Sequence, residues 1–313
     1  MKYLITGGAG FIGSHIVKKL VNLGNNVTVF DDFSTGNIDN LKEIKNKIKI
    51  IKGDISNLNQ VKKAAKNIDY ISHHAAIPSV QMSIKNPLRA HNVNLTGTLN
   101  ILLAAKENKV KRVVFAGSAS VYGNEKSIPK KETTLPLPVS AYGIHKLTAE
   151  KYCKLFSILY RLDTVVLRYF NAYGPNQSLK SDYATVIPIF ITRMLRDKSP
   201  IIFGDGKQTR DFVYIDNLVD ANIKAFNYKK KFNGDIFNIA SGQRYNLIEL
   251  INHLNKIIGK KIMPVFGKEK KGEVRHSLAD ISKAKKLLKY KPVIGFKEGL
   301  KITYWSYTKL LFF

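Results

Sequence analysis

The sequence predicts an α/β protein whose larger part is a doubly wound parallel sheet and whose C-terminal part forms a smaller domain. Three observations lead to this fold class. Apolar runs alternate with amphipathic stretches through the first half of the chain, a glycine-rich turn joins the first run to the first amphipathic stretch, and the rhythm breaks up after residue 168. Strands that alternate with helices are typical of parallel sheets covered by helices.

The predicted elements follow from hydrophobic periodicity. Short apolar runs rich in β-branched and aromatic residues predict strands, and apolar residues three and four positions apart predict helices. The strands are Tyr3–Thr6, Asn26–Phe30, Ile48–Lys52, Tyr70–His73, Arg112–Ala116 and Thr164–Arg168, and the helices are Phe11–Leu23, Leu58–Lys66, Pro87–Asn108 and Ala141–Tyr160. Right-handed crossovers between successive strands then place the helices on both faces of the sheet.

The rest of the chain has shorter elements. Pro175, Pro188, Pro200 and the turn at 203–206 interrupt it. We expect residues 1–170 to form the sheet domain and residues 171–313 to form mainly the second domain, over the carboxyl edge of the sheet, with some segments returning to the sheet. For the aromatic tail 304–313, a helix docked on the core is favoured over an interface or membrane-touching segment.

Composition excludes several classes of protein. A hydrophobic fraction of 44% excludes wholesale disorder, and no apolar run approaches the roughly 18 residues of a membrane span. The first residues lack the pattern of a signal peptide, and the single cysteine, Cys153, cannot form an internal disulfide, so we expect a cytoplasmic protein with Cys153 in the core.

The net charge of +28 invites a polyanion as partner. Only nine of the 51 basic residues are Arg, however, and the many Lys accompany many Ile and Asn, as a compositional bias would produce. Zinc-finger, RRM and basic-zipper patterns are missing, so we expect no specific nucleic-acid partner and no membrane partner. The seven His show no metal-ligand spacing, so no metal is expected either.

The turn after the first strand predicts a dinucleotide site. In the run 6–13, Gly7 permits a tight turn, Gly10 lets the backbone approach a pyrophosphate, and Gly13 lets the helix pack on the strand. The start of that helix, at Phe11 and Ile12, offers free N–H groups to phosphate oxygens.

Acidic and small residues at the ends of the next strands support this prediction. Asp31, followed by Asp32, ends the second strand, where a carboxylate accepts hydrogen bonds from the adenosine ribose and repels a 2′-phosphate. NAD is therefore expected rather than NADP. The adenine would lie at Asp54 and Ile55, and the pyrophosphate would pass the small side chains after the fourth strand, at His74, Ala75 and Ala76.

A Tyr and a Lys four positions apart predict the catalytic pair. Tyr142 and Lys146 share one face of a helix, where an ammonium stabilises a phenolate and lowers the pKa of the phenol from about 10. Ser118 lies at the carboxyl end of the fifth strand, which is the rim where such sheets bind ligands.

With these residues in view, the chain resembles an extended short-chain dehydrogenase/reductase of the UDP-glucose 4-epimerase family. The resemblance runs from Tyr3 to about Tyr290. The segments that carry it are 6–13, 94–98, 117–123, Tyr142 with Lys146, 168–175, 208–214 and 272–280.

The resemblance implies roles for individual residues. Tyr142 would be the base, Lys146 would lower its pKa and hold the nicotinamide ribose, and Ser118 would assist at the sugar 4-hydroxyl. Asn94 and Tyr169 would support the cofactor. The residues implied in substrate binding are Asn171 and Arg210 at the diphosphate, Phe203 near the uracil, Val186, Lys270 and Ser277. The helices 87–108 and 141–160 resemble the pair that forms a homodimer interface in the family.

Two departures bear on the substrate. Lys270 stands where the family has an Arg at the diphosphate, and a Lys offers a point charge instead of a bidentate fork. Ser277 stands at the position that gates pocket width, and a small residue there resembles enzymes that admit an N-acetyl group. The resemblance therefore implies a 4-epimerase of UDP-GlcNAc and UDP-GalNAc with tightly bound NAD, and UDP-Glc and UDP-Gal are further candidate substrates.

Three alternatives stay open. A nucleotide-sugar dehydratase or decarboxylase would carry an acid just after Ser118, where Ala119 and Ser120 stand instead. A UDP-glucuronate 4-epimerase is the second alternative, because Arg275 is a candidate partner for a carboxylate. A non-catalytic dinucleotide-binding regulator is the third, although such proteins can lose the Tyr and Lys that this chain keeps.

Overall fold

The computed structural model describes residues 1–179, 185–269 and 274–312, and the side chains of residues 311 and 312 are not described. Its centre is a seven-stranded sheet in the order β11-β6-β5-β4-β1-β2-β3, with every neighbouring pair parallel. The strands are β1 (Lys2–Thr6), β2 (Asn26–Asp31), β3 (Lys49–Lys52), β4 (Tyr70–His73), β5 (Arg112–Ser118), β6 (Thr164–Tyr169) and β11 (Asp235–Ile239). The predicted doubly wound sheet and its six strands are confirmed.

The seventh strand, β11, was not predicted. It comes from the second half of the chain and pairs with β6 along its whole length, Asp235 opposite Val165 and Ile239 opposite Tyr169. The run is only five residues long and follows a Lys-rich turn, so periodicity by itself could not separate it from the irregular segments around it.

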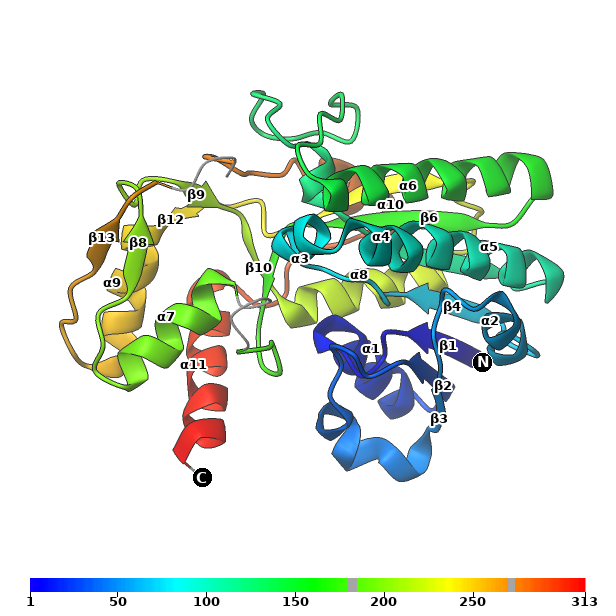
Figure 1. Cartoon of the computed structure of the whole chain (residues 1–313), viewed down its shortest axis with the longest axis horizontal. Helices are drawn as coiled ribbons and strands as arrows, with labels where there is room; N and C mark the ends of the chain where they lie inside the picture. Colours follow the sequence, from blue (N-terminus) through cyan, green and yellow to red (C-terminus); the bar gives the residue numbers. More distant parts are fainter. Residues whose placement is uncertain (180–184, 270–273, 313) are drawn as a thin grey trace.

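Helices cover both faces of the sheet (Figure 1). α1 (Phe11–Asn22) and α8 (Ile215–Asn227) pack together on one face, and α2 (Leu58–Ala64), α5 (Gly97–Glu107) and α6 (Ala141–Tyr160) lie on the other. The side chains of β1 alternate between the two faces of the sheet. Tyr3 and Ile5 join the core under α1 and α8, while Leu4 joins the core under α5. Cys153 is buried in the second core, as predicted.

The predicted helix 87–108 is interrupted. It begins as α4 (Pro87–His91), passes through a π-helical turn at Asn92–Thr96 and continues as α5, and it is preceded by the short α3 (Val80–Lys85). The side chain of Asn94, inside the π turn, is bonded to both backbone groups of Ile77. The wider turn therefore lets a polar side chain hold the loop after β4, which the apolar periodicity of the sequence did not reveal.

Most of the remaining elements lie beyond the carboxyl ends of the sheet strands, on the left of Figure 1. Three two-stranded sheets pair β7 (Asn171–Tyr173) with β10 (Phe212–Tyr214), β9 (Thr209–Arg210) with β12 (Tyr245–Asn246), and β8 (Ile201–Phe203) with β13 (Val265–Gly267). The helices of this part are α7 (Val186–Leu195), α9 (Leu247–Ile258) and α11 (Phe296–Phe312), whereas α10 (Ser282–Leu288) packs against β11 and α8. Two 3₁₀ segments, Ile38–Lys47 and Ala119–Val121, complete the described elements.

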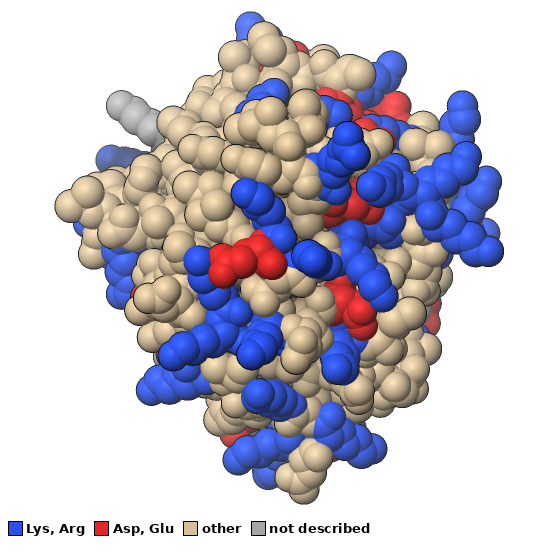
Figure 2. All heavy atoms as spheres, turned by 90° about the vertical axis from the view of Figure 1, so that its right-hand side faces the viewer, with Lys and Arg blue, Asp and Glu red and all other residues tan. Residues whose placement is uncertain are grey.

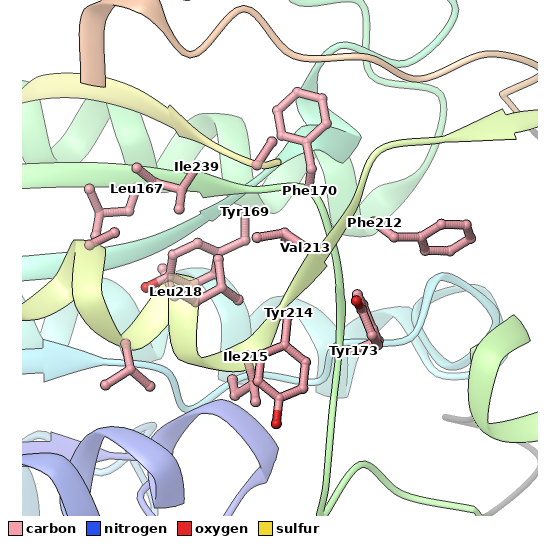
Figure 3. Packing of buried hydrophobic residues seen from close by; sticks show 14 of the residues in the cluster. Leu167, Tyr169, Phe170, Tyr173, Phe212, Val213, Tyr214, Ile215, Leu218 and Ile239 are labelled. Atoms are coloured by element: carbon pink, nitrogen blue, oxygen red, sulfur yellow. The ribbon is translucent and has the colours of Figure 1, made fainter. Parts of the chain in front are cut away.

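One apolar cluster joins the two parts of the molecule. Figure 3 shows side chains of β6, such as Leu167 and Tyr169, packed with residues of β10 and the start of α8. The ring of Tyr173 meets that of Tyr214 edge-on at 5.6 Å between centroids. Because the core continues from the sheet into the smaller part, the carboxyl edge of the sheet is held against it.

The aromatic tail is a docked helix. In α11, Tyr304 and Tyr307 are buried, and the Tyr307 hydroxyl donates to the carbonyl of Gln177 at 2.7 Å. The predicted docking on the core is therefore confirmed. In the described part of the chain, none of the helices combines the length and the apolar character that crossing a membrane requires.

Candidate active site

The glycine turn has the shape that a bound pyrophosphate needs. Gly7 has φ +67°, and a Cβ there would lie 2.6 Å from the Ala75 nitrogen. A Cβ on Gly13 would lie 2.2 Å from the Gly7 oxygen. Gly10 is the N-cap of α1 and brings no side chain to the helix end, so the N–H groups of the first turn, at Phe11 and Ile12, are not covered by a capping side chain.

Asp31 holds this turn from the end of β2. Its carboxylate accepts hydrogen bonds from the backbone N–H of Ala9 and of Phe33, both at 2.9 Å. Burial raises the pKa of Asp31, and the two hydrogen bonds oppose that rise. Asp32, in contrast, is exposed and accepts from the backbone and hydroxyl of Ser34.

The residues that follow β3 and β4 lie at the same carboxyl edge of the sheet as the glycine turn. Asp54 is exposed and accepts from the Ser56 N–H, while Ile55 is buried beneath it. His74 stacks on Tyr169 with ring centroids 6.0 Å apart, and burial lowers its pKa to about 3, so the ring is neutral. Its Nδ1 is buried and has no hydrogen-bond partner within the described chain.

These features fit a dinucleotide. The turn leaves backbone and a helix N-terminus open where a phosphate would lie, the small residues Ala75 and Ala76 border it, and the unpartnered His74 Nδ1 is a polar group that a ligand can satisfy. The side chains of Asn94 and Tyr169, which the resemblance placed at the cofactor, are hydrogen-bonded to other parts of the protein. Asn94 is bonded to Ile77, and the Tyr169 hydroxyl accepts from Asn222 at 2.7 Å.

Ser118, Tyr142 and Lys146 meet beside this cradle. Ser118 ends β5, and Tyr142 is the second residue of α6, two positions after the helix cap Ser140, whose hydroxyl accepts from Gly143. Lys146 is buried one helical turn further on and donates to the Ala116 carbonyl at 2.8 Å. Its Nζ lies 5.8 Å from the centre of the Tyr142 ring.

The electrostatics of this pair differ from the sequence prediction. Burial raises the pKa of Tyr142, and only its hydrogen bond with Ser118 lowers it, so the expected lowering by Lys146 is not seen. The reason is that Lys146 is itself buried, which lowers its own pKa to about 8, and its ammonium is directed at a carbonyl.

Ser120 was not singled out from the sequence as a functional residue. Its hydroxyl and its N–H both donate to the Ser118 oxygen, at 2.9 and 3.2 Å. Ser118 therefore accepts two hydrogen bonds and keeps its own proton to give to a neighbouring oxygen. A second hydroxyl two residues after the first was the signal available in the sequence.

The residues implied in substrate binding lie on the smaller part of the molecule. Arg210 and Ser277 are brought together, since Ser277 N–H donates to the Thr209 carbonyl and the Arg210 guanidinium donates to the Arg275 carbonyl. Asn171 is exposed on β7, Val186 is the first residue of α7, and Phe203 is 40% exposed at the end of β8. Lys270 lies outside the described residues.

Asp211 is a further organising residue that the sequence did not single out. It is fully buried next to Arg210 and accepts from Ser241, Gly242 and Ala279. In the sequence, the only indication of this role was the position of an acidic residue between Arg210 and an apolar strand. Among the described residues, three or more His, Cys, Asp or Glu side chains are nowhere grouped as a metal site would require.

Comparison with known proteins gives the family. The model of the NAD dependent epimerase/dehydratase family matches residues 3–240. The chain belongs to this family. Its fold is that of the extended short-chain dehydrogenases/reductases, as predicted, and its cofactor is NAD.

Three relatives show how far the likeness extends. A putative UDP-glucose 4-epimerase of Methanocaldococcus jannaschii is 40% identical over 95% of both chains. The UDP-N-acetylglucosamine 4-epimerase of Methanobrevibacter ruminantium, solved with UDP-N-acetylmuramic acid, has a TM-score of 0.94 at 37% identity and covers 99% of both chains. The UDP-glucuronic acid 4-epimerase of Bacillus cereus, solved with UDP-glucuronic acid and NAD, has a TM-score of 0.92 at 36% identity, covering 99% of this chain and all of that one.

Proposed function

We propose that the protein is an NAD-dependent UDP-sugar 4-epimerase, and that UDP-GlcNAc and UDP-GalNAc are its substrates, with UDP-Glc and UDP-Gal accepted as well. The observation that carries the proposal is the meeting of Ser118, Tyr142 and Lys146 beside the glycine turn. A phenol hydrogen-bonded to a hydroxyl, with an ammonium one helical turn away, forms an acid–base group suited to an alcohol that loses a proton.

The chemistry follows from these side chains. Tyr142, as the phenolate, takes the proton of the sugar 4-hydroxyl, and Ser118 donates a hydrogen bond to the same oxygen. Lys146 supplies positive charge behind the phenolate. NAD, held at the glycine turn and Asp31, would supply reversible hydride acceptance at C4. The same Tyr142 returns the proton after the 4-keto sugar has turned over, so C4 is inverted.

The segments beyond the sheet edge are proposed to bind the UDP part. Arg210 and Asn171 would contact the diphosphate, with Lys270 as a further point charge, and Phe203 would lie against the uracil. Val186 would border the sugar. On this proposal, residues 1–170 serve the cofactor and residues 171–313 mainly the UDP-sugar.

The structure bears on the choice of sugar. Arg275 donates to Asp205 at 2.6 Å and lies 3.6 Å from Glu269, so its charge is already engaged by two carboxylates. This favours a neutral sugar over a uronic acid. Ser277 is small, which favours room for an N-acetyl group, and the Methanobrevibacter relative acts on UDP-N-acetylglucosamine.

The test is direct. The purified protein is incubated separately with UDP-GlcNAc, UDP-Glc and UDP-GlcA, and NMR follows the configuration at C4. We expect inversion of UDP-GlcNAc and slower inversion of UDP-Glc. If only UDP-GlcA were inverted, the proposed substrate would be wrong and the protein would be a UDP-glucuronate 4-epimerase. If NAD bound but no new epimer formed from any sugar, the protein would be a non-catalytic regulator.

We also propose that the protein acts in the cytoplasm as a homodimer. The outer side of α6 carries exposed apolar side chains at Leu155, Ile158 and Leu159, and Leu88 of α4 is 78% exposed. Large apolar side chains gathered on neighbouring helices are typical of an interface. Light scattering should give twice the mass of one chain, and Ile158→Glu should give a monomer.

A further inference from the structure

Glu150 is a buried acid on the catalytic face of α6 that the proposed chemistry does not use. Tyr142, Lys146 and Glu150 follow one another at intervals of four residues, so their side chains share one stripe of the helix. Glu150 is only 2% exposed, and the buried Lys146 lies between it and the phenol. An isolated carboxylate is costly at such a position, and its presence there calls for a partner.

Arg168 of β6 fixes the Glu150 carboxylate. Its Nε lies 3.0 and 3.2 Å from the two carboxylate oxygens, and its Nη2 lies 2.7 Å from one of them. Gly117, one residue before Ser118, leaves the space for this pair, because a Cβ there would lie 3.1 Å from Glu150 Oε1. The carboxylate is therefore held directly behind the end of β5.

Of the titratable groups around Lys146, Glu150 is the one that can balance its positive charge. Tyr142, Glu150 and Cys153 face it from α6, and His73 at the end of β4 and His74 just after that strand face it from the sheet. Burial keeps both His neutral and raises the pKa of the Cys153 thiol, so none of these three residues carries a charge at neutral pH. Burial raises the pKa of Glu150, and its hydrogen bonds and ion pair with Arg168 oppose that rise. While Tyr142 is protonated, the paired Glu150 carboxylate is the anion among these groups, and it raises the pKa of Lys146 against the effect of burial.

We propose that Glu150 is a positioning residue of the reaction: its carboxylate, clamped by Arg168, keeps Lys146 an ammonium beside Tyr142. The proposal rests on the proposed function for its consequence in turnover, but its electrostatic content concerns this chain alone. Glu150 acts through Lys146 and touches neither sugar nor cofactor. Arg168 acts one step further back, because it keeps the carboxylate charged and in place.

The test is a titration of Lys146 in the protein without substrate, by NMR of lysines labelled at the side-chain nitrogen. The Lys146 signal is assigned by its loss in Lys146→Met. In Glu150→Gln we expect the midpoint to fall by about one pH unit, because a counter-charge is removed from a buried cation. Glu150→Asp keeps the charge and should restore most of the midpoint.

A double variant separates this role from simple pairing with Arg168. Glu150→Gln with Arg168→Met removes both charges and leaves no buried guanidinium unpaired, so it also serves where the single variant does not fold. We expect its Lys146 midpoint to stay below that of the unchanged protein. A midpoint equal to that of the unchanged protein would mean that Glu150 serves Arg168 only, and the proposal would be wrong.

Two further readouts complete the test. Glu107→Gln removes an exposed carboxylate that pairs with Lys62 at the end of α5, and it should leave the Lys146 midpoint unchanged. In turnover, the alkaline limb of the pH profile should move to lower pH in Glu150→Gln by the shift seen in the titration. A shifted midpoint with no epimerisation by the unchanged protein would reject the proposed function and leave the electrostatic proposal standing.

Discussion

At the scale of single residues, the pKa of Tyr142 depends on burial more than on the spacing between Tyr142 and Lys146. Ser118, Tyr142 and Lys146 could be proposed as a site because each stands at a recognisable place, a strand end or a helix spacing of four, and the structure brings the three together. The direction of the Tyr142 pKa could not be predicted in this way, since it depends on how deeply the phenol and the ammonium are buried.

Removal of the Tyr142 hydroxyl should abolish most of the turnover. For Tyr142→Phe we expect a loss of about 10²–10⁴-fold, the usual contribution of a positioned acid–base group. NAD binding, followed by protein fluorescence, should be retained, because the glycine turn and Asp31 are untouched. Turnover close to that of the unchanged protein would mean that another group is the base.

The raised pKa of Tyr142 sets a direction for the pH dependence. The base acts when ionised, so turnover should rise with pH through its pKa. Ser118→Ala removes the hydrogen bond that lowers this pKa, and the rising limb of the pH profile should then move to higher pH. A limb that moves to lower pH would contradict the assigned role of Ser118.

Ser277 is the residue at which substrate choice can be tested. Ser277→Tyr should suppress turnover of UDP-GlcNAc and spare that of UDP-Glc, because a bulky ring would occupy the space of the acetyl group. The ratio of kcat/KM for the two sugars is the measurement, with Ser277→Thr as a nearly isosteric control. Equal losses on both sugars would reject the gating role.

At the scale of elements, local patterns predicted what local interactions stabilise. α6 begins after a serine cap and has the predicted bounds. The helix 87–108 instead contains a π turn, in which Asn94 bonds to Ile77, a residue seventeen positions earlier in the chain. β11 was missed because its partner, β6, is distant in sequence. The register of a parallel pair is decided by packing across the sheet.

A buried ion pair at the amino end of the sheet joins such distant elements. Arg112 of β5 donates to Asp163 at 2.6 Å and to four carbonyls at and after the end of α8. Arg112→Met leaves Asp163 buried without its cation and should lower the free energy of unfolding by about 3–5 kcal/mol. Chemical denaturation measures this.

The neighbouring pair of Lys111 with Asp69 supplies the control. It has a similar distance, 2.9 Å, but the Lys111 side chain is 57% exposed. Lys111→Met should therefore leave the denaturation midpoint unchanged, because solvent screens exposed pairs. Equal effects of the two variants would mean that burial does not set the strength of the Arg112 pair.

At the scale of the whole molecule, the surplus of positive charge is spread over exposed lysines. Figure 2 shows one face of the molecule, with Lys and Arg side chains far outnumbering acids. The loops that precede the sheet strands carry exposed lysines such as Lys109, Lys111 and the run 229–231. Lysines spread in this way give a general attraction to polyanions that salt screens.

The charge should accordingly act without specificity. We expect the protein to bind a heparin column at low ionic strength and to elute with a few tenths molar salt, on the order of the screening expected for exposed charges. Exchange of Lys229, Lys230 and Lys231 for Glu should lower the eluting salt concentration and leave turnover unchanged. If the protein stayed on the column at high salt, it would instead have a specific polyanion-binding site.

The sequence by itself determined the parallel sheet, the glycine turn, the end of β2 at Asp31 and the stripe of Tyr142 and Lys146, because each depends on residues close together in the chain. The tertiary structure decided the rest. It showed that Asp31 accepts a hydrogen bond from Ala9 and that Ser118 accepts one from Ser120. It also showed that Arg275 is paired with Asp205, and that Arg168 binds Glu150 behind Lys146. These contacts join segments or orient groups through burial and hydrogen-bond geometry, and both exist only once the chain has folded.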